Sequence, residues 1–463
     1  MRDLFDIMGY MDSTPNTTDA RSAQTPAPPL TSVSVSEALE AILSHFSPLE
    51  PVEVAFTEAL GLVLAEDVYS DIDIPPFDNS SMDGYAVRAE DTAGAGADRP
   101  AVLKVMGYLP AGAAPGPHDR VEQGAAFRIM TGAPLPPGAD AVVPFEDTSE
   151  GRALRDPALL PAQARALPVQ VGGEVLIYRS VRPGDYVRRA GEDVREGEVV
   201  LRAGATVRPA EVGVMAAVGK SRVRVHRRPR VVVLATGDEL VDVDVRPGIG
   251  QIRNTNNYAV AAQVASWGAQ AFNLGVARDD PRHLLSKLNE ALALQPDLLV
   301  TSAGVSVGDY DMVKDVLTSL GTISMWRVRV KPGKPLAFGR LGERAVPFLG
   351  LPGNPVSAMV SMELFGRPAV MKMLGKRRLF RPVISARALE PLDNPGGREH
   401  YMRGIITREG DEYVARTTGK QESNILTGMA RANALLIVGE DTRRVEAGQM
   451  VRALMLDWPE EVF

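Results

Sequence analysis

RVVVLATGDEL, residues 230–240, sets the fold class of the largest part of this chain. It is an apolar, β-branched run that ends at a glycine and is followed by two acidic residues. Three later apolar runs extend the pattern: QAFNLGVA (270–277), PDLLVTSAG (296–304) and VPFLGLPG (346–353). The segments between them repeat apolar residues at helical spacing. This alternation predicts a doubly wound α/β domain over residues 229–376, with a parallel sheet covered on both faces.

Shorter strands and turns are expected on either side of this domain. Residues 71–184 contain apolar runs such as AVLKVMGYL, cut by AGAAPGP and GAPLPPGAD, which predict a β-rich domain. EHYMRGIITREGDEYVARTT (399–418) and ANALLIVGE (432–440) predict a small β domain over residues 377–463. Residues 33–70 and 185–228 are interpreted as two separated segments of a linking domain, with a helix at 209–218. The fold class is therefore α/β plus β in a multidomain chain.

The N-terminal part begins with a segment that we expect to be disordered, residues 1–32. From residue 11 it is polar and proline-rich, so burial cannot offset the entropy of ordering it. A helix is expected to follow, because Ser34 and Glu37 form a capping-box pattern and apolar residues then recur at helical spacing up to Phe46. Residues 149–168, SEGRALRDPALLPAQARALP, are expected to form a mobile surface loop.

The composition is that of a soluble, multidomain globular protein. The 463 residues are 45% hydrophobic and 24% charged, and no apolar run approaches the length of a membrane span. The net charge of -7 argues against a nucleic-acid-binding protein. Because there is no cysteine, disulfides, thiol catalysis and cysteine metal sites are excluded, and any metal must be bound by oxygen ligands. The N-terminus does not resemble a secretory signal, so we expect a cytoplasmic protein.

The loops that follow the predicted strands are the first candidate site. Ligands of open α/β sheets bind at the carboxyl ends of the strands, where glycine-rich turns and helix N-termini suit oxyanions. The alternative is that these are ordinary strand-to-helix turns. Their many carboxylates favour Mg²⁺, with a solvated acidic rim as the alternative. The carboxylates are Asp238, Glu239, Asp279, Asp280, Asp309 and Asp311.

Three further segments are candidates because they are irregular and rich in polar residues. KPGKP (331–335) places two lysines three positions apart on a loop stiffened by proline, which suits an anion. PPFDNSSMDGYA (75–86) and RIMTGAPLPPGADAVV (128–143) have neither strand nor helix periodicity, which is typical of shaped loops. For Asp78 and Asn79 the alternative interpretation is a structural Asx-turn.

These motifs occur together and in order with GED (191–193), GQIRNTN (250–256) and LPGNPVSA (351–358). The combination resembles the molybdopterin molybdenumtransferases, the molybdenum insertases of molybdenum-cofactor biosynthesis, over residues 33–458. The eukaryotic relative is the E domain of gephyrin. The resemblance implies an elongated homodimer that inserts molybdate into adenylylated molybdopterin with Mg²⁺ and releases AMP and the finished cofactor.

The resemblance also implies roles for particular residues. Asp279, Asp311 and Glu239 match acidic positions that handle Mg²⁺ and the phosphoanhydride, and Asp78 and Asp193 match further acidic residues of the catalytic cleft. The implied molybdate pocket contains Lys334, Pro335, Arg403 and Ser423. The other implied substrate-binding residues are Thr131, Gly304, Ser306, Lys331, Pro352, Gly353 and Pro355. At Asn254 the family often has Asp, so this chain loses a possible acid there; the alternative is that the position only caps a helix.

Two other functions remain open at this level. One is a non-catalytic dimeric scaffold of the gephyrin type, since a fold can serve binding without catalysis. The other is the molybdopterin adenylyltransferase, which shares the α/β domain but is typically a single domain with a TGGTG-type loop where this chain has SAGVSVGD. The resemblance also admits that adenylyltransferase as a partner of this chain.

Overall fold

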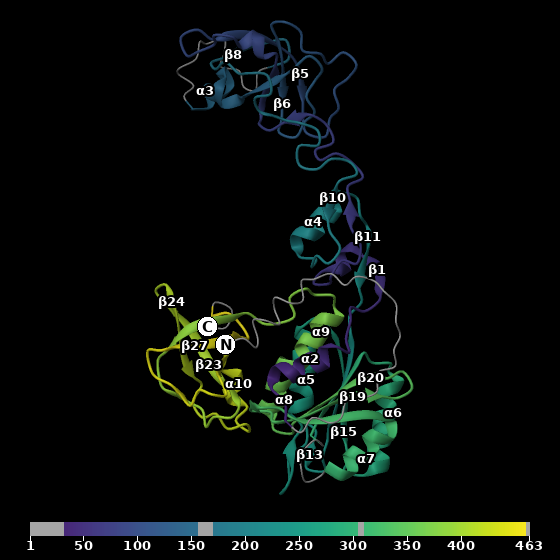
Figure 1. The fold of residues 1–463 in the computed structure, drawn as a ribbon. Helices are drawn as coiled ribbons and strands as arrows, with labels where there is room; N and C mark the ends of the chain where they lie inside the picture. The colour runs from purple at the N-terminus through teal and green to yellow at the C-terminus, as the bar shows by residue number, and fades with distance from the viewer. Residues whose placement is uncertain (1–31, 156–169, 304–309, 460–463) are drawn as a thin grey trace. The chain divides into compact units, whose positions relative to one another are not determined.

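The computed structural model describes residues 32–155, 170–303 and 310–459 (Figure 1). The predicted lead, residues 1–32, therefore lies almost entirely outside the described residues. The chain divides into two compact units. The first contains residues 1–66, 204–208 and 222–463, and the second contains residues 67–203 and 209–221. None of the described helices is long and apolar enough to cross a membrane.

A six-stranded sheet forms the centre of the first unit, in the order β15-β12-β16-β20-β19-β17. The first four strands are parallel, as the sequence predicts, whereas β19 and β17 are antiparallel to their neighbours. The parallel arrangement of the four predicted strands is confirmed, and β19 and β17 add an antiparallel edge. Residues 328–334 between β17 and β19 are too few for the crossover that a parallel pair needs. The bounds are β12 Arg230–Thr236, β15 Gln270–Ala277, β16 Leu298–Ser302, β17 Gly321–Arg327, β19 Pro335–Leu341 and β20 Val346–Leu351.

Helices cover both faces of this sheet (Figure 1). On one face Leu284 and Leu288 of α6 pack with Val232, Leu234 and Phe348 of the sheet in a fully buried core. Each helix lies where the sequence periodicity predicts it, and α8 continues through a π-helical turn, Met362–Gly366, into α9. The bounds are α5 Asn256–Ser266, α6 Pro281–Ala293, α7 Tyr310–Leu320, α8 Pro355–Ser361 and α9 Arg367–Met373.

The predicted N-terminal helix is α2, Val35–Leu43, and Ser34 and Glu37 form the expected capping box. It packs on α9, where the Lys372 ammonium donates to the Leu43 carbonyl at 2.9 Å. The sequence analysis places this helix in the linking domain, whereas its contacts are with the α/β domain. The predicted domain boundaries stay predictions, because the two compact units combine several of the predicted domains.

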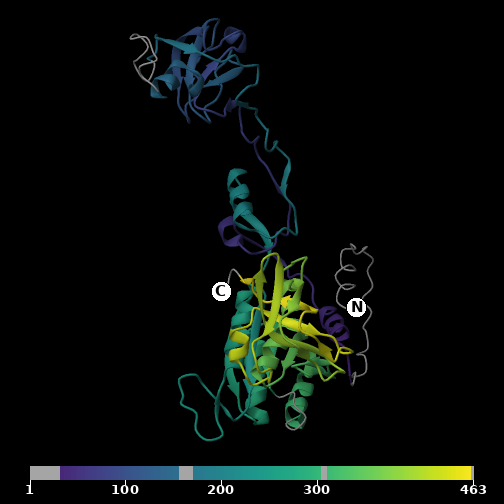
Figure 2. The same cartoon turned by 90° about the vertical axis from the view of Figure 1, so that its left-hand side faces the viewer.

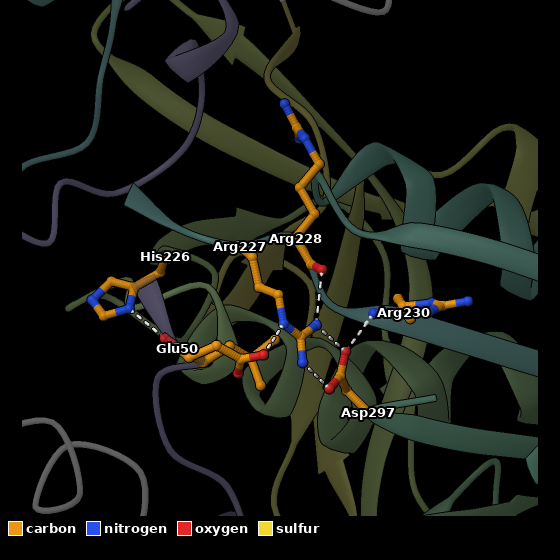
Figure 3. Close-up of polar contacts among 7 residues, drawn as sticks. Glu50, His226, Arg227, Arg228, Arg230 and Asp297 are labelled. Carbon is orange, nitrogen blue, oxygen red and sulfur yellow. Dashed lines mark hydrogen bonds and ion pairs between the residues drawn. The ribbon is translucent and has the colours of Figure 1, made fainter. Parts of the chain in front are cut away.

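A salt-bridge network joins the start of β12 to the preceding segment (Figure 3). β1, Pro51–Ala55, pairs with β11, Arg222–His226, and the next residue is Arg227. Its guanidinium donates to both carboxylate oxygens of Asp297, at 2.6 and 2.7 Å, and to Glu50 at 2.6 Å. Asp297 also accepts from the Arg230 amide at 2.8 Å. A bidentate ion pair constrains the relative orientation of its two side chains as well as bringing opposite charges together. The pair therefore sets the angle at which the chain enters the sheet.

The C-terminal part of the first unit is a second six-stranded sheet, in the order β18-β23-β24-β21-β27-β25. It closes on itself because β23 also pairs with β25. The strand β18, Val330–Lys331, comes from the α/β domain and pairs in parallel with the start of β23. This pairing joins the two domains beside the predicted anion loop. The other bounds are β21 Val383–Ala388, β23 Glu399–Glu409, β24 Glu412–Thr417, β25 Ala434–Val438 and β27 Met450–Met455.

Several short elements complete the first unit. β22 pairs with β26, and β13 pairs with β14 around a loop that projects from this unit, where Ile249 is fully exposed (Figure 2). The Asn254 side-chain oxygen accepts from the Asn257 amide in the first turn of α5, whose N-cap residue is Thr255. The bounds are η1 Phe56–Ala59, β13 Leu240–Val241, β14 Ile252–Arg253, β22 Leu392–Asp393, α10 Thr427–Ala430 and β26 Arg444–Val445.

The second unit contains the predicted β-rich domain, a five-stranded sheet in the order β7-β4-β6-β5-β8. Two strand pairs, β3-β9 and β2-β10, and the predicted helix α4 lie in the same unit. The strands are β2 Val68–Tyr69, β3 Asn79–Ser80, β4 Gly84–Val87, β5 Ala101–Leu109, β6 Ala125–Ile129, β7 Ala141–Pro144, β8 Glu174–Ile177, β9 Val187–Arg188 and β10 Val199–Leu201. The helices are η2 Ala89–Thr92, η3 Phe145–Asp147, α3 Ser149–Arg155 and α4 Pro209–Ala217.

Helix α3 corrects one prediction, because residues 149–155 were expected to belong to a mobile loop. Glu150 is buried, pairs with Arg128 at 2.7 Å and accepts from the Tyr85 hydroxyl at 2.9 Å. The Ser149 hydroxyl accepts from the Leu176 amide. These partners lie far away in the sequence, so local composition does not reveal them. Residues 156–168, the rest of the predicted loop, lie outside the described residues.

Candidate functional site

A cavity of about 730 Å³ lies in the first unit where the α/β domain meets the C-terminal sheet. Three segments line it: the loop between β18 and β19, the loop between β20 and α8, and the segment after β24. Arg398, just before β23, completes the lining. The lining residues are Lys331, Pro332, Gly333, Lys334, Pro335, Pro352, Gly353, Asn354, Ser357, Arg398, Gln421, Glu422, Ser423 and Asn424.

The charge of this cavity is predominantly positive. Lys331, Lys334 and Arg398 line it together with a single carboxylate, Glu422, among the described residues. Burial, with Arg398 nearby, lowers the pKa of Lys331, and Glu422 opposes that shift. None of the three cations forms an ion pair with a described residue. Uncompensated cations on a partly buried surface attract oxyanions, so the cavity suits a ligand with several negative charges.

Arg403 lies behind the segment that follows β24 and is completely buried. Its Nη2 donates to the carbonyls of Lys420, at 2.7 Å, and Glu422, at 3.3 Å. Its Nε and Nη1 have no partner within the described part of the chain. Burial lowers the pKa of Arg403. A buried guanidinium with unused donors is costly without a ligand or water. Arg403, which the sequence predicts in the molybdate pocket, is not among the residues that line the cavity but lies behind them.

Hydrogen bonds to backbone carbonyls hold the segments that line the cavity in place. The Val356 amide, in the first turn of α8, donates to the Ser423 carbonyl at 3.1 Å. On the other side, the Asn256 side chain donates to the Gly353 carbonyl at 2.7 Å. The structure thereby brings together six residues predicted from the sequence, and a seventh, Pro355, begins α8 beside them. The six are Lys331, Lys334, Pro335, Pro352, Gly353 and Ser423.

The predicted acidic rim lies at the carboxyl ends of β12 and β15. The Asp238 amide donates to Oδ2 of Asp279 and the Asp279 amide donates to Oδ1 of Asp238, both at 3.2 Å. Glu239 follows in the same loop. Asp280 has a different task, since it caps α6 by accepting from the His283 amide at 2.8 Å. The rim therefore offers Asp279 and Glu239 to a ligand, while Asp280 serves the helix.

The predicted metal ligands can be compared with this geometry only in part. Of the three, Asp311 is in the first turn of α7, where its side chain is not described. The predicted substrate-binding residues Gly304 and Ser306 lie outside the described residues. Among the described residues no three acidic or histidine side chains converge as a cage. Mg²⁺ usually takes one or two carboxylates and completes its shell with phosphate oxygens and water. Asp279 and Glu239 on one rim fit that requirement.

The remaining predicted residues lie in the second unit. Asp78 accepts from the Ala190 amide at 2.8 Å and pairs with Arg189 at 2.6 Å, and these two contacts hold its pKa below the ordinary value. Thr131 donates from its amide and its hydroxyl to Asp83, at 2.7 and 2.8 Å. The loops that carry Asp78 and Thr131 lie side by side, since the Leu135 amide donates to the Asp78 carbonyl. Asp193 is exposed in a turn of the same unit.

Sequence reasoning missed several residues of the site. Arg398, Gln421 and Glu422 line the cavity, and Asp83 holds Thr131. Asp83 stands inside the PPFDNSSMDGYA motif, and Gln421 and Glu422 are neighbours of the predicted Ser423 in KQESN (420–424), so these motifs were a usable signal. Arg398 precedes HYMRG and is brought to the cavity by the pairing of β18 with β23, which no local pattern predicts.

Comparison with protein families gives three matches that together cover most of the chain. Residues 33–219 match the MoeA N-terminal region (domain I and II). Residues 232–372 match a probable molybdopterin binding domain, and residues 385–456 match the MoeA C-terminal region (domain IV).

Individual proteins agree with these matches. Molybdopterin molybdenumtransferase 1 of Mycobacterium tuberculosis is 37% identical over 426 residues, which are 88% of this chain and 95% of that protein. Molybdopterin molybdenumtransferase of Nostoc is 34% identical, over 86% of this chain and 87% of that protein. The crystal structure of a molybdopterin biosynthesis MoeA protein from Pyrococcus horikoshii superposes with a TM-score of 0.73 at 31% identity, and covers 92% of this chain and 100% of that one.

Proposed function

The chain belongs to the molybdopterin molybdenumtransferase family, and on that premise we propose that it inserts molybdate into adenylylated molybdopterin and releases AMP. The observation that carries this proposal is the cavity of about 730 Å³, in which Lys331, Lys334 and Arg398 face a single described carboxylate. Molybdate is a tetrahedral dianion, and the second substrate adds the negative charge of a phosphoanhydride. Both substrates need an excess of cationic and N–H donors.

Molybdate is assigned to the end of the cavity that Lys334, Pro335 and Ser423 line, in front of Arg403. Lys334 is a mobile point charge, whereas Arg403 is fixed by its bonds to the carbonyls of Lys420 and Glu422. The guanidinium has two unused donors, Nε and Nη1, and we assign them to the oxyanion, which they would orient. The Ser423 hydroxyl supplies a neutral donor. The positive charges of Lys334 and Arg403 together equal the double negative charge of molybdate, so the bound site carries no excess charge.

Cleavage of the phosphoanhydride is assigned to the acidic rim. When bound, Mg²⁺ would neutralise phosphate charge during cleavage, and Asp279 and Glu239 would hold it. The reciprocal bonds with Asp238 keep the Asp279 carboxylate at the end of β15. In the cleavage step water adds to one phosphorus and the bridging oxygen leaves with the other, so the products are AMP and the phosphate of the cofactor. Lys331 and Arg398 would stabilise the charge on the departing phosphate.

Asp78 and Thr131 are assigned to the same reaction through dimer formation. They lie in the second compact unit, whereas the cavity and the rim lie in the first. We propose a homodimer in which each site takes Asp78 and Thr131 from one chain and Asp279, Asp311 and Lys334 from the other. The lowered pKa of Asp78 keeps that carboxylate ionised at neutral pH, as a contact to the metal or to bound water requires.

The function is tested by incubating the purified full chain with adenylylated molybdopterin, molybdate and Mg²⁺. We expect AMP release that depends on molybdate, together with a product that activates a cofactor-free molybdoenzyme. Lack of both activities in the folded protein would contradict the proposal and favour a scaffold. Adenylylation of bare molybdopterin with ATP, in a parallel reaction, would instead identify an adenylyltransferase.

A further inference from the structure

The side chain of Gln421 makes three hydrogen bonds around the buried Arg403. Its Oε1 accepts from the Arg403 amide at 2.8 Å, and its Nε2 donates to the Arg403 carbonyl at 3.2 Å. The same Nε2 donates to the Gly419 carbonyl at 2.9 Å. One carboxamide thus satisfies both backbone groups of Arg403 and closes the turn that follows β24.

These contacts fill a gap in the β-ladder. The pairing of β23 with β24 ends at Gly404 and Thr417, one step short of Arg403. The Thr418 amide still reaches the Arg403 carbonyl at 3.0 Å, but the chain then turns away. The Arg403 amide consequently depends on Gln421 instead of a neighbouring strand. Arg403 lies within β23 and still pairs with Leu435 of β25, so Gln421 supplies the contact that is missing on the β24 side. A buried amide without an acceptor costs about 1–3 kcal/mol.

The same side chain determines where the cavity segment lies. Residues 420–424 leave the sheet at this point, and the Arg403 guanidinium holds them from behind through the carbonyls of Lys420 and Glu422. Ser423, two residues after Gln421, faces the cavity and accepts from the Val356 amide through its carbonyl. A substitution that removes the Gln421 hydrogen bonds would therefore displace both Arg403 and Ser423. The two residues lie on opposite sides of the segment 420–424.

We propose that Gln421 is a positioning residue for the oxyanion, acting through Arg403 and Ser423. This inference rests on the proposed function, because it takes molybdate to be the anion at this end of the cavity. The carboxamide is required as a combined donor and acceptor. A Glu side chain has the same shape, but its carboxylate would face the carbonyls of Arg403 and Gly419 without a hydrogen to offer. A Met side chain has similar length and offers neither function.

The test compares Gln421→Glu and Gln421→Met with a matched control, Gln449→Glu. Gln449 lies in the same C-terminal domain, where its side chain accepts from the Glu446 amide, and it is not among the residues that line the cavity. Two quantities are measured for each full-length protein: the equilibrium affinity for molybdate alone, and the KM values for molybdate and adenylylated molybdopterin. Thermal unfolding of each variant is recorded in parallel.

We expect both Gln421 variants to bind molybdate about tenfold more weakly and to raise the KM for molybdate by a similar factor. The kcat at saturating molybdate and the KM for the adenylylated pterin should stay near the wild-type values, as should all values of Gln449→Glu. A purely structural role would lower the unfolding temperature and the active fraction without changing molybdate affinity, and that result would overturn the inference. If the wild-type protein itself failed to bind molybdate, the proposed function would fail with it.

Discussion

Asp238 and Asp279 each accept a hydrogen bond from the backbone amide of the other, at 3.2 Å in both directions. The two residues follow β12 and β15, which are neighbours in the sheet. Each carboxylate uses one named oxygen for this purpose, Oδ1 in Asp238 and Oδ2 in Asp279. The pair therefore fixes the rim by backbone contacts and leaves the other oxygen of Asp279 for a ligand.

Replacing Asp279 by Asn should separate its structural role, the hydrogen bond with Asp238, from its role in binding a ligand. The amide oxygen of Asn can still accept from Asp238, so the stability should change by less than about 0.5 kcal/mol. The lost charge should lower turnover about a hundredfold, since a group that stabilises charge at the reacting centre typically contributes that much. The matched control is Asp280→Asn, in which Asn still caps α6. The assay is AMP release at limiting Mg²⁺. Near-normal turnover of Asp279→Asn, or a larger loss in Asp280→Asn, would show that Asp279 was wrongly chosen.

Removing the Lys334 ammonium should weaken molybdate use more than pterin use. Lys334→Ala takes away a cation that lines the cavity and that pairs with no described carboxylate. We expect the KM for molybdate to rise about tenfold, with partial rescue of the rate by extra molybdate. Arg329→Ala is the control, because Arg329 pairs with Glu440 at 3.0 Å and is not a lining residue. An equal rise in the KM for the adenylylated pterin would move Lys334 to the phosphate end of the cavity.

A dimer with shared sites predicts complementation between inactive variants. Asp78→Ala removes a residue of the second unit and Asp279→Ala a residue of the first. A mixed dimer would then contain one intact site and one doubly damaged site. Random mixing makes about half of the dimers mixed, so about a quarter of the wild-type activity should return in the mixture and about half in the purified mixed dimer. Co-expression with two different tags and purification through both tags isolates the mixed dimer. Absence of activity in that dimer, once shown to be folded, would mean that each site is built within one chain.

The two carboxylates that bind Arg227, Asp297 and Glu50, should contribute very different amounts to the stability of the first unit. Asp297→Ala leaves the Arg227 guanidinium and the Arg230 amide without their partner, which should cost about 2–3 kcal/mol. The Glu50 side chain is 65% exposed, so Glu50→Gln should cost less than about 0.5 kcal/mol. Urea unfolding followed by tryptophan fluorescence measures this unit, because Trp267, Trp326 and Trp458 all belong to it. Equal losses for the two variants would contradict the prediction.

His400 should make the first unit sensitive to acid. Burial, then the charges of Lys331, Arg403 and Arg398, lower the pKa of this histidine to about 4. The unfolded chain, with an ordinary histidine pKa, binds a proton at higher pH than the folded chain does. Stability is therefore complete above about pH 6.5 and is lost progressively as the pH falls towards 4. Between pH 7 and pH 5 we expect the wild type to lose about 2 kcal/mol more than His400→Gln. Parallel pH curves for both proteins, measured by urea unfolding, would exclude this role.

Periodicity predicted the α/β domain well because each of its strands and helices has a local signature. The strands β12, β16 and β20 and the helices α5 to α9 lie where the apolar spacing places them. Two features escaped because they depend on distant contacts. Helix α3 is held by Arg128 and Tyr85, which are 22 and 65 residues from Glu150. The antiparallel edge of the sheet follows from the short connection to β19, and strand patterns do not carry direction.

Residues of the candidate site could be predicted from the sequence where several of them stand in the same loop. Lys331, Lys334 and Pro335 stand in one motif, and the structure keeps them on one side of the cavity. Arg398 reaches the cavity because β18 pairs with β23. Gln421 reaches it because its side chain accepts from the Arg403 amide in place of a neighbouring strand. Neither contact produces a periodic pattern in the sequence. The metal ligands and the domain boundaries stay predictions.

The two residues of β18 have a consequence for the evolution and synthesis of this chain. Val330 and Lys331 are encoded with the α/β domain but complete a sheet of the C-terminal domain. Exchange of either domain for a homologous one would therefore have to preserve this pairing. Because β27 pairs with both β21 and β25, this sheet is complete only when the chain has been synthesised to residue 455, so the partner strands of β18 take their places late in synthesis.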